Sequence, residues 1–126
     1  MSGSAPATEP EVLPGCIFCE IVRATRPAEI VAETDVVVAF RDIAPVAPTH
    51  VLVVPRRHIA DASTLGPNEG HVVGSMFALA RTVAERDDVL KSGYRLVLNV
   101  GRDANNSVGH LHLHVIGGRS MSWPPG

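Results

Sequence analysis

The chain has 126 residues, of which 45% are hydrophobic, and a net charge of −2, which together predict one folded domain with its own core. A protein that binds a nucleic acid polymer needs a basic surface or aromatic stacking platforms, and neither fits this charge or an aromatic content of 4%. No apolar run approaches the roughly 18 residues of a membrane span, so no membrane contact is expected.

The N-terminal segment predicts a tail rather than a targeting signal. It reads MSGSAPATEPEVLP, which is small, proline-rich and acidic and lacks the basic and apolar regions of a secretory signal. We predict a flexible tail over residues 1–14 and a folded domain over residues 15–126. The two cysteines, Cys16 and Cys19, are too few for a secreted disulfide framework, which favours a cytoplasmic protein.

The first half of the domain predicts a short helix and three strands. Residues 16–24 can form the helix, which Pro27 ends. β-branched residues over 30–32 and 36–40 predict a hairpin. A third strand is predicted over residues 50–55, after a loop that contains two prolines.

The second half predicts one long helix and two more strands. The helix covers residues 67–88, and strands over residues 94–99 and 110–116 flank a polar loop at 101–109. The apolar residues at helical spacing, which would face the sheet, are Val72, Met76, Ala80, Val83 and Ala84. The order β-β-β-α-β-β predicts an α+β fold with about five antiparallel strands, one long helix and one short N-terminal helix.

Three histidines alternate with apolar residues in the last predicted strand, which begins HLHLHV at residue 110. Because strand side chains alternate between faces, His110, His112 and His114 would share one face. Imidazole is a good nucleophile at neutral pH, and neighbouring imidazoles can hold phosphoryl oxygens. Alternate histidines on a strand also chelate metals, so this row alone leaves a metal site as the rival interpretation.

The motif HLHLHVI at residues 110–116 resembles the signature of the histidine triad (HIT) superfamily. Further segments resemble its Hint branch in order and spacing: CIFCEI, AFRDI, APTH, VPRRHI and GYRLV, and finally GGRSMSWPPG. The match covers about residues 16–126. The resemblance implies a HIT fold whose sheet is extended by homodimerisation. It also implies a purine nucleoside phosphoramidase that releases a nucleoside monophosphate such as AMP.

The resemblance assigns catalytic roles residue by residue. His112 is the expected nucleophile and becomes covalently nucleotidylated, while His114 contacts the phosphate and the leaving group. His110 orients His112, and His50 lies beside the row and supports it. Ser107 carries a hydroxyl that can donate to phosphate oxygens or to the leaving amine.

The resemblance also implies a nucleotide site. Asp42 would accept hydrogen bonds from both ribose hydroxyls, although Asp is equally ordinary at the start of a loop that contains proline. Phe40 and Ile43 would line an apolar slot for the purine. Asn99 would donate to phosphate oxygens. Trp123 would cap the leaving-group side.

One loop departs from the Hint pattern. Residues 103–107 read DANNS in place of the usual GGQS run, and Gly109 stands where a bulky residue is common. Asn tolerates left-handed backbone angles, so we expect Asn105 and Asn106 to let the loop turn and to lie near the phosphate. The altered loop leaves the preference for the leaving group open.

The cysteines predict a separate centre. Cys16 and Cys19 stand at i and i+3, a spacing that also suits a redox pair or two buried thiols. By resemblance to bacterial HIT proteins, we expect a structural zinc held by this pair, His50 and His110, which catalysis does not require. His58 fits either a functional residue or a partly exposed histidine at the start of a helix.

Two other functions stay open from the sequence. One is a HIT-type hydrolase of dinucleoside polyphosphates, against which the C-terminal WPPG argues. The other is a zinc- and nucleotide-binding regulatory protein with little turnover, against which the intact histidine row argues.

Overall fold

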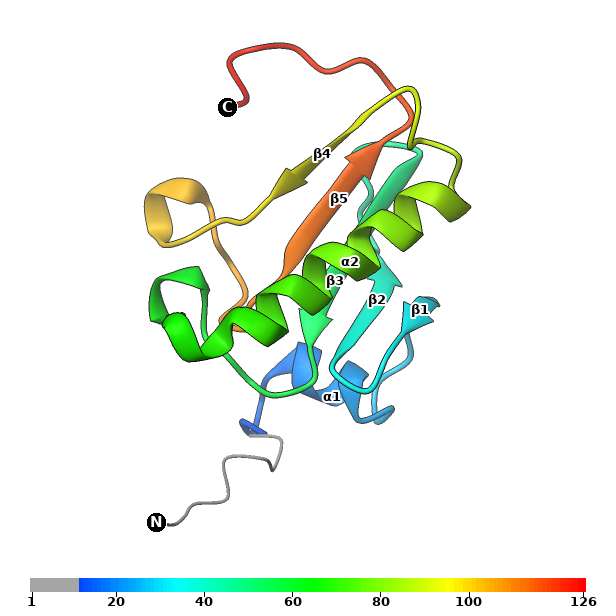
Figure 1. Ribbon diagram of the computed structural model, residues 1–126. Coiled ribbons are helices and arrows are strands. Elements are labelled where there is room, and N and C mark those ends of the chain that lie inside the picture. The colour runs from blue at the N-terminus through cyan, green and yellow to red at the C-terminus, as the bar shows by residue number, and fades with distance from the viewer. Residues whose placement is uncertain (1–11) are drawn as a thin grey trace.

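The computed structural model describes residues 12–126, and its elements follow the predicted order (Figure 1). The helices are α1 (Ile17–Val22) and α2 (Gly70–Arg86), and the strands are β1 (Ile30–Glu33), β2 (Val37–Arg41), β3 (Thr49–Pro55), β4 (Tyr94–Val97) and β5 (Leu113–Gly117). The predicted flexible tail falls mostly on residues 1–11, which lie outside the described residues. Over the described range, every helix is too short or too polar to cross a bilayer.

The five strands form one antiparallel sheet in the order β1-β2-β3-β5-β4. The predicted α+β class, with one long and one short helix, is confirmed. β5 is the last strand in the sequence but lies between β3 and β4, so neighbouring strands flank it on both sides. β1 and β4 form the edges, and extension of the sheet across a homodimer stays a prediction.

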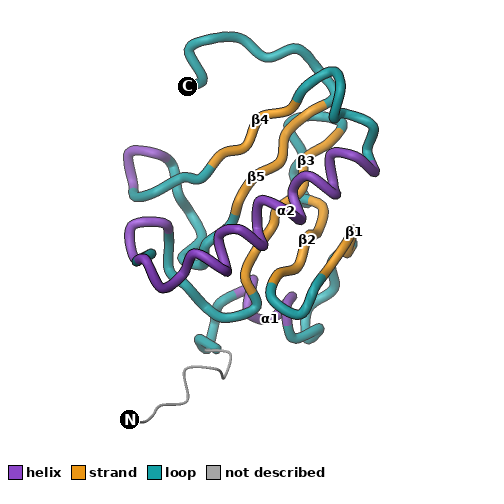
Figure 2. The backbone as a smooth tube through the Cα atoms, viewed as in Figure 1, coloured by secondary structure: helices purple, strands orange, loops and turns teal. Residues whose placement is uncertain are grey.

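The two faces of the sheet carry different layers. α2 crosses one face and contacts β1, β2, β3 and β5 (Figures 1 and 2). The core on this face contains Val37, Ala39, Val51, Val53, Leu113 and Val115 from the strands, with Met76, Leu79, Ala80 and Val83 from α2. The alternate strand residues face the other side, where Phe18 of α1 packs with Val38, Phe40, Leu52 and Val54.

The two helices begin differently. Cys16 is the N-cap of α1, and its Sγ accepts the N–H of Cys19 at 3.3 Å. The helix ends earlier than predicted, and Ala24 adopts a left-handed φ of 61°. α2 begins later than predicted, at Gly70, because Pro67–Glu69 first forms a 3₁₀ turn. The cap places both cysteines at the start of one short helix.

The last strand is shorter than predicted. β5 begins at Leu113, three residues later than the sequence predicts. The preceding segment bonds to the last residue of β3 and to the chain just after it instead of extending the ladder. Leu111 N–H donates to the carbonyl of Ile59 at 2.6 Å, and the Nε2 of His110 lies 3.0 Å from the carbonyl oxygen of Pro55. The start of the histidine row therefore leaves the sheet.

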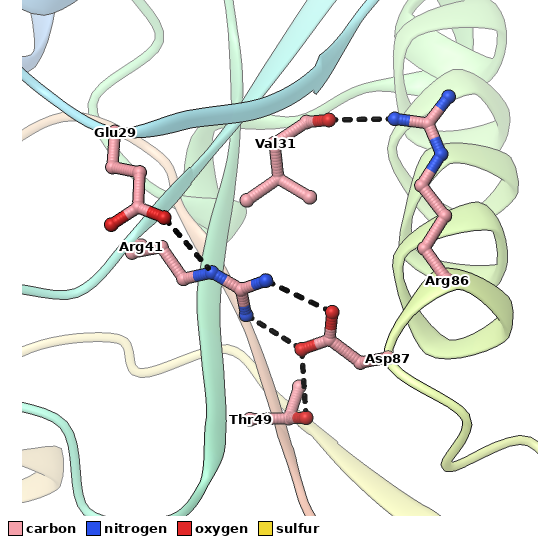
Figure 3. Close-up of polar contacts among 6 residues, drawn as sticks. All are labelled: Glu29, Val31, Arg41, Thr49, Arg86 and Asp87. Carbon is pink, nitrogen blue, oxygen red and sulfur yellow. Dashed lines mark hydrogen bonds and ion pairs between the residues drawn. The ribbon is translucent and has the colours of Figure 1, made fainter.

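An ion pair ties the end of α2 to the sheet. Arg41, the last residue of β2, donates two hydrogen bonds to the Asp87 carboxylate at 2.6 and 2.9 Å, and the Thr49 hydroxyl donates a third at 2.8 Å (Figure 3). Hydrogen bonding to Arg41 lowers the pKa of Asp87. Because Arg41 and Thr49 flank residues 42–48, this cluster fixes both ends of the loop that begins with Asp42.

Candidate active site and metal centre

The alternation predicted for the histidine row is visible in the packing. Its apolar members, Leu111, Leu113 and Val115, lie in the core beneath α2. The histidines lie on the opposite face, where the ring centres of His112 and His114 are 5.0 Å apart. The row thus combines one apolar face with one imidazole face.

His112 is held with one ring nitrogen free. Its Nδ1 lies 2.7 Å from the carbonyl oxygen of His110. A carbonyl only accepts, so neutral His112 carries its proton on Nδ1 and keeps a lone pair on Nε2. Phe18 packs edge-on against the ring, with centres 5.2 Å apart. His112 therefore presents an unprotonated nitrogen in a fixed orientation, as a nucleophile requires.

A second chain of hydrogen bonds sets the protons on His50 and His114. The N–H of Val46 donates to His50 Nδ1 at 3.1 Å, so neutral His50 carries its proton on Nε2. That Nε2 lies 2.9 Å from His114 Nδ1 and donates to it, which puts the proton of His114 on its own Nε2. Within residues 12–126, this buried Nε2 has no hydrogen-bond partner. His114 therefore offers a free N–H donor.

Burial keeps these imidazoles neutral. Desolvation lowers the pKa of His114 to about 4, and the proximity of His112 and His50 acts in the same direction. Burial likewise lowers the pKa of His110 to about 4 and lowers the pKa of His50 below its ordinary value. The donors and acceptors assigned to His50 and His114 therefore hold at neutral pH.

Asp42 lies beside His50 at the start of the loop after β2. Its Oδ2 is 3.4 Å from His50 Nε2, and its Oδ1 accepts the N–H of Ala44 at 2.8 Å. The side chain is 19% exposed, so the carboxylate keeps lone pairs that can accept from a ligand's hydroxyl groups.

Apolar side chains flank the histidines on the same face. Phe40, Leu52 and His114 lie side by side across β2, β3 and β5. Phe18 meets Phe40 edge-on, with ring centres 5.4 Å apart. Ile43 is 99% exposed, so it projects from its loop instead of packing beside Phe40. Phe18 and Leu52 were not predicted as site residues. The position of Phe18 between two cysteines was a signal for the first, and the alternation of side chains along β3 was a signal for the second.

The connection between β4 and β5 carries the predicted polar residues. Asn105 adopts the left-handed conformation expected for it, with φ 61° and ψ 37°. The Oδ1 of Asn106 is buried and has no partner in the described part of the chain. Ser107 is exposed and lines an open groove of about 360 Å³ together with residues 13–17. Asn99, just after β4, is half-buried.

Four ligand-type side chains converge at the start of α1: Cys16, Cys19, His58 and His110. The Sγ of Cys19 lies 3.3 Å from His58 Nδ1 and 3.5 Å from His110 Nδ1, and the two nitrogens are 3.2 Å apart. Tetrahedral zinc, with bonds of about 2.3 Å to sulfur and 2.0 Å to nitrogen, separates S–N pairs by about 3.5 Å and N–N pairs by about 3.3 Å. The cluster has the donors and the spacing of such a centre.

Contacts around the cluster support metal binding. The Nε2–H of His110 donates to the Pro55 carbonyl at 3.0 Å, so its Nδ1 directs a lone pair into the cluster. A hydrogen bond from the second ring nitrogen is usual for histidines that bind metals. Burial raises the pKa of the Cys19 thiol, so a metal that binds there displaces a proton.

The structure corrects one member of the predicted metal site. His50 lies with His114 rather than with the cysteines, and the Val46 N–H occupies its Nδ1 while its Nε2 carries a proton. It therefore has no free lone pair for a metal. His58 takes its place, because the chain after β3 brings its Nδ1 to 3.3 Å from the Sγ of Cys19.

The C-terminal segment contacts the loop that carries Val46 and the edge strand β4. Arg119 Nε–H donates to the Val46 carbonyl at 2.9 Å, and Arg95 of β4 donates to the Ser122 carbonyl at 3.0 Å. Trp123 is 82% exposed, so its ring is available for contact with a ligand or a partner.

A histidine row on a five-stranded antiparallel sheet, with one long helix behind it, defines the class of histidine triad domains, and the comparisons agree. The HIT domain family matches residues 23–121. An uncharacterised HIT-like protein of Synechococcus elongatus is 42% identical over 110 residues, which cover 87% of this chain and 96% of the relative. The purine nucleoside phosphoramidase of Escherichia coli is 38% identical over 105 residues, covering 83% and 88%.

Solved structures agree with the sequence relatives. A HIT family hydrolase from Legionella pneumophila has a TM-score of 0.87 and 40% sequence identity, and the match covers 89% of this chain and 100% of that chain. This chain belongs to the HIT domain family.

Proposed function

We propose that the protein hydrolyses the P–N bond of purine nucleoside 5′-phosphoramidates and releases the nucleoside monophosphate. The hydrogen bond from His112 Nδ1 to the carbonyl of His110, 2.7 Å long, carries this proposal because it leaves Nε2 unprotonated. Support also comes from the Escherichia coli relative, which bears the name purine nucleoside phosphoramidase.

In the first step, the Nε2 lone pair of His112 attacks phosphorus. An N–P bond forms, the bond from phosphorus to the amine breaks, and the amine leaves with the electron pair and takes a proton from solvent. The ring of His112 becomes cationic in this intermediate. The carbonyl of His110 stabilises that cation through the Nδ1–H that it already accepts.

His114 acts on the leaving group. Its free Nε2–H would donate a hydrogen bond to the departing nitrogen, where negative charge develops. Asn99, Asn106 and Ser107 would contact the phosphoryl oxygens, together with the main-chain amide of Asn105. In the second step, water attacks the phosphorus and releases a proton to solvent, the N–P bond breaks, and His112 regains its lone pair as the nucleoside monophosphate leaves.

The same face provides a nucleoside site. The Asp42 carboxylate would accept both ribose hydroxyls, and Phe40 would form the apolar floor on which a purine rests, with Phe18 beside it. Ile43, which is 99% exposed, would cover the purine from the loop. Burying that side chain against a base removes apolar surface from water and so favours binding.

We also propose a structural zinc at Cys16, Cys19, His58 and His110. When bound, zinc would link α1 to the segment after β3, which carries His58, and to the segment before β5, which carries His110. These links would stabilise the fold. A homodimer formed through an edge strand would satisfy exposed backbone groups, and Trp123 would then reach the leaving-group side of a site.

The comparison of two substrates tests the proposed reaction. We expect a much higher kcat/KM for an adenosine 5′-phosphoramidate with an aromatic amine than for diadenosine tetraphosphate. The reverse order would establish a polyphosphate hydrolase instead. Tight AMP binding without cleavage of either substrate would establish a nucleotide-binding regulatory protein.

A further inference from the structure

We infer that Arg119 is a positioning residue that acts through Val46 on the proton positions of His50 and His114. The guanidinium donates from Nε to the Val46 carbonyl at 2.9 Å, and the N–H of Val46 donates to His50 Nδ1 at 3.1 Å. His50 then donates to His114 at 2.9 Å. The C-terminal segment is thus connected to the free N–H of His114 through three hydrogen bonds. The inference rests on the proposed function for its kinetic part.

Hydrophobic burial does not hold the loop that carries Val46. The side chain of Val46 is 55% exposed and that of Ile43 is 99% exposed. The loop's own polar contacts run from Asp42, whose N–H donates to the carbonyl of His50 at 3.0 Å and whose Oδ1 accepts from Ala44. These contacts fix the start of the loop. Arg119 therefore supplies an outside contact at Val46 itself.

Close packing brings the C-terminal segment to this loop. Gly117 pairs with Thr49 in the sheet, so the residues that follow β5 run beside the residues that precede β3. A Cβ on Gly118, which has a φ of +91°, would lie only 3.0 Å from the Cβ of Pro48. Glycine at this point lets the two backbones approach closely, and Arg119 follows directly.

The position of Val46 decides which nitrogen of His50 carries the proton. With the Val46 N–H at Nδ1, only the Nε2–H form of neutral His50 is compatible with both contacts. If the loop moves away, the proton can occupy Nδ1, and His50 then presents a lone pair to His114. His114 would then carry its proton on Nδ1, to donate to His50. Its Nε2 would lose the proton proposed to contact the leaving nitrogen.

Three variants separate this role from a general structural one. Arg119→Met removes the donor, and Arg119→Lys keeps a cationic donor of similar length. Arg86→Met is the matched control, because Arg86 also donates to a main-chain carbonyl, that of Val31, at 2.6 Å on the α2 side of the sheet (Figure 3). Thermal melting identifies any variant that fails to fold.

Two readouts decide the inference. Ring ¹⁵N chemical shifts at neutral pH report the tautomers of His50 and His114 in the unliganded protein. Steady-state kinetics with an alkylamine and an arylamine phosphoramidate report the hydrogen bond to the leaving nitrogen, which matters more for the more basic amine.

We expect Nε2–H tautomers in wild type, Arg86→Met and Arg119→Lys, and mixed tautomers in Arg119→Met. Loss of one hydrogen bond should lower kcat of Arg119→Met about 2- to 10-fold for the alkylamine and less for the arylamine. Wild-type tautomers in Arg119→Met, a Lys variant that behaves like the Met variant, or equal losses with both amines would each overturn the inference. If wild type cleaves neither amine, the proposed function fails, whereas the tautomers still decide the role of Arg119.

Discussion

The Nδ1–H of His112 donates to the main-chain carbonyl of His110, and the two atoms lie 2.7 Å apart. The ring of His110 meanwhile directs Nδ1 toward Cys19, His58 and the thiol of Cys16, which lies 3.4 Å away. One residue therefore belongs to both centres. Its side chain faces the other three proposed zinc ligands, and its backbone sets the free nitrogen of the proposed nucleophile.

Substitution of single histidines should distinguish the two histidine clusters. We expect His58→Asn to weaken zinc binding by about 100-fold or more, beyond the 10- to 100-fold cost typical of outer-shell contacts. His50→Asn is the matched control and should retain zinc, because His50 contacts His114 rather than the cysteines. Metal analysis after dialysis measures both. Zinc retained by the His58 variant but lost from the His50 variant would contradict the assignment.

Stability between pH 6.5 and 4 should depend on His114. Burial lowers its folded pKa to about 4, below the ordinary value of 6.5. The unfolded chain therefore binds the proton first, and the free energy of unfolding falls as pH decreases through this window. In His114→Asn the decline should be shallower, as measured by urea unfolding at several pH values. Parallel curves for wild type and variant would show that His114 is not protected from protonation.

The contribution of Asp87 to stability depends on pH in a lower pH range than that of His114. Its folded pKa is lowered by Arg41, so the ion pair stabilises the protein above the unfolded value of about 3.9, and this stability is lost as pH falls through the lower folded value. At pH 7, Asp87→Asn should cost about 2 kcal/mol, as for hydrogen bonds to charged groups.

Glu29→Gln is the control for this ion pair. Glu29 approaches the same guanidinium only to 3.9 Å and is 78% exposed (Figure 3). Its loss should change stability by less than about 0.5 kcal/mol. Urea unfolding at pH 7 measures both variants, and equal effects would rule out a special role for the Asp87 pair.

Nucleotide affinity should depend on Phe18. Its ring packs against His112 and Phe40, so Phe18→Leu should weaken AMP binding about 3-fold or more through lost aromatic contact. Phe77→Leu serves as control, because Phe77 is 43% exposed on α2, across the sheet. Calorimetric titration with AMP gives both affinities. An unchanged Kd in the Phe18 variant would place the purine elsewhere.

The sequence predicted the elements that are marked by a regular spacing of apolar residues. The alternation of Leu113 and His114 follows from strand geometry, and the packing shows it. The start of β5 was not predictable, because it depends on hydrogen bonds from residues 110 and 111 to the distant carbonyls of Pro55 and Ile59. No local pattern encodes such contacts.

The metal site shows the same limit. His50 and His58 lie eight residues apart, one at the start of the predicted third strand and the other just after its end. What separates them is tertiary: the N–H of Val46 occupies one nitrogen of His50, whereas the chain after β3 brings His58 to Cys19. The VPRRHI segment held a signal for His58, but spacing alone did not rank it above His50.

The most direct test of the central claim is mass spectrometry of quenched wild-type and His112→Asn protein mixed with an adenosine phosphoramidate that carries a fluorogenic amine. The wild type should release the amine in a burst and carry an AMP adduct that maps to His112. The variant should show neither the burst nor the adduct. Equal cleavage by both proteins, or an adduct on another residue, would contradict His112 as the nucleophile.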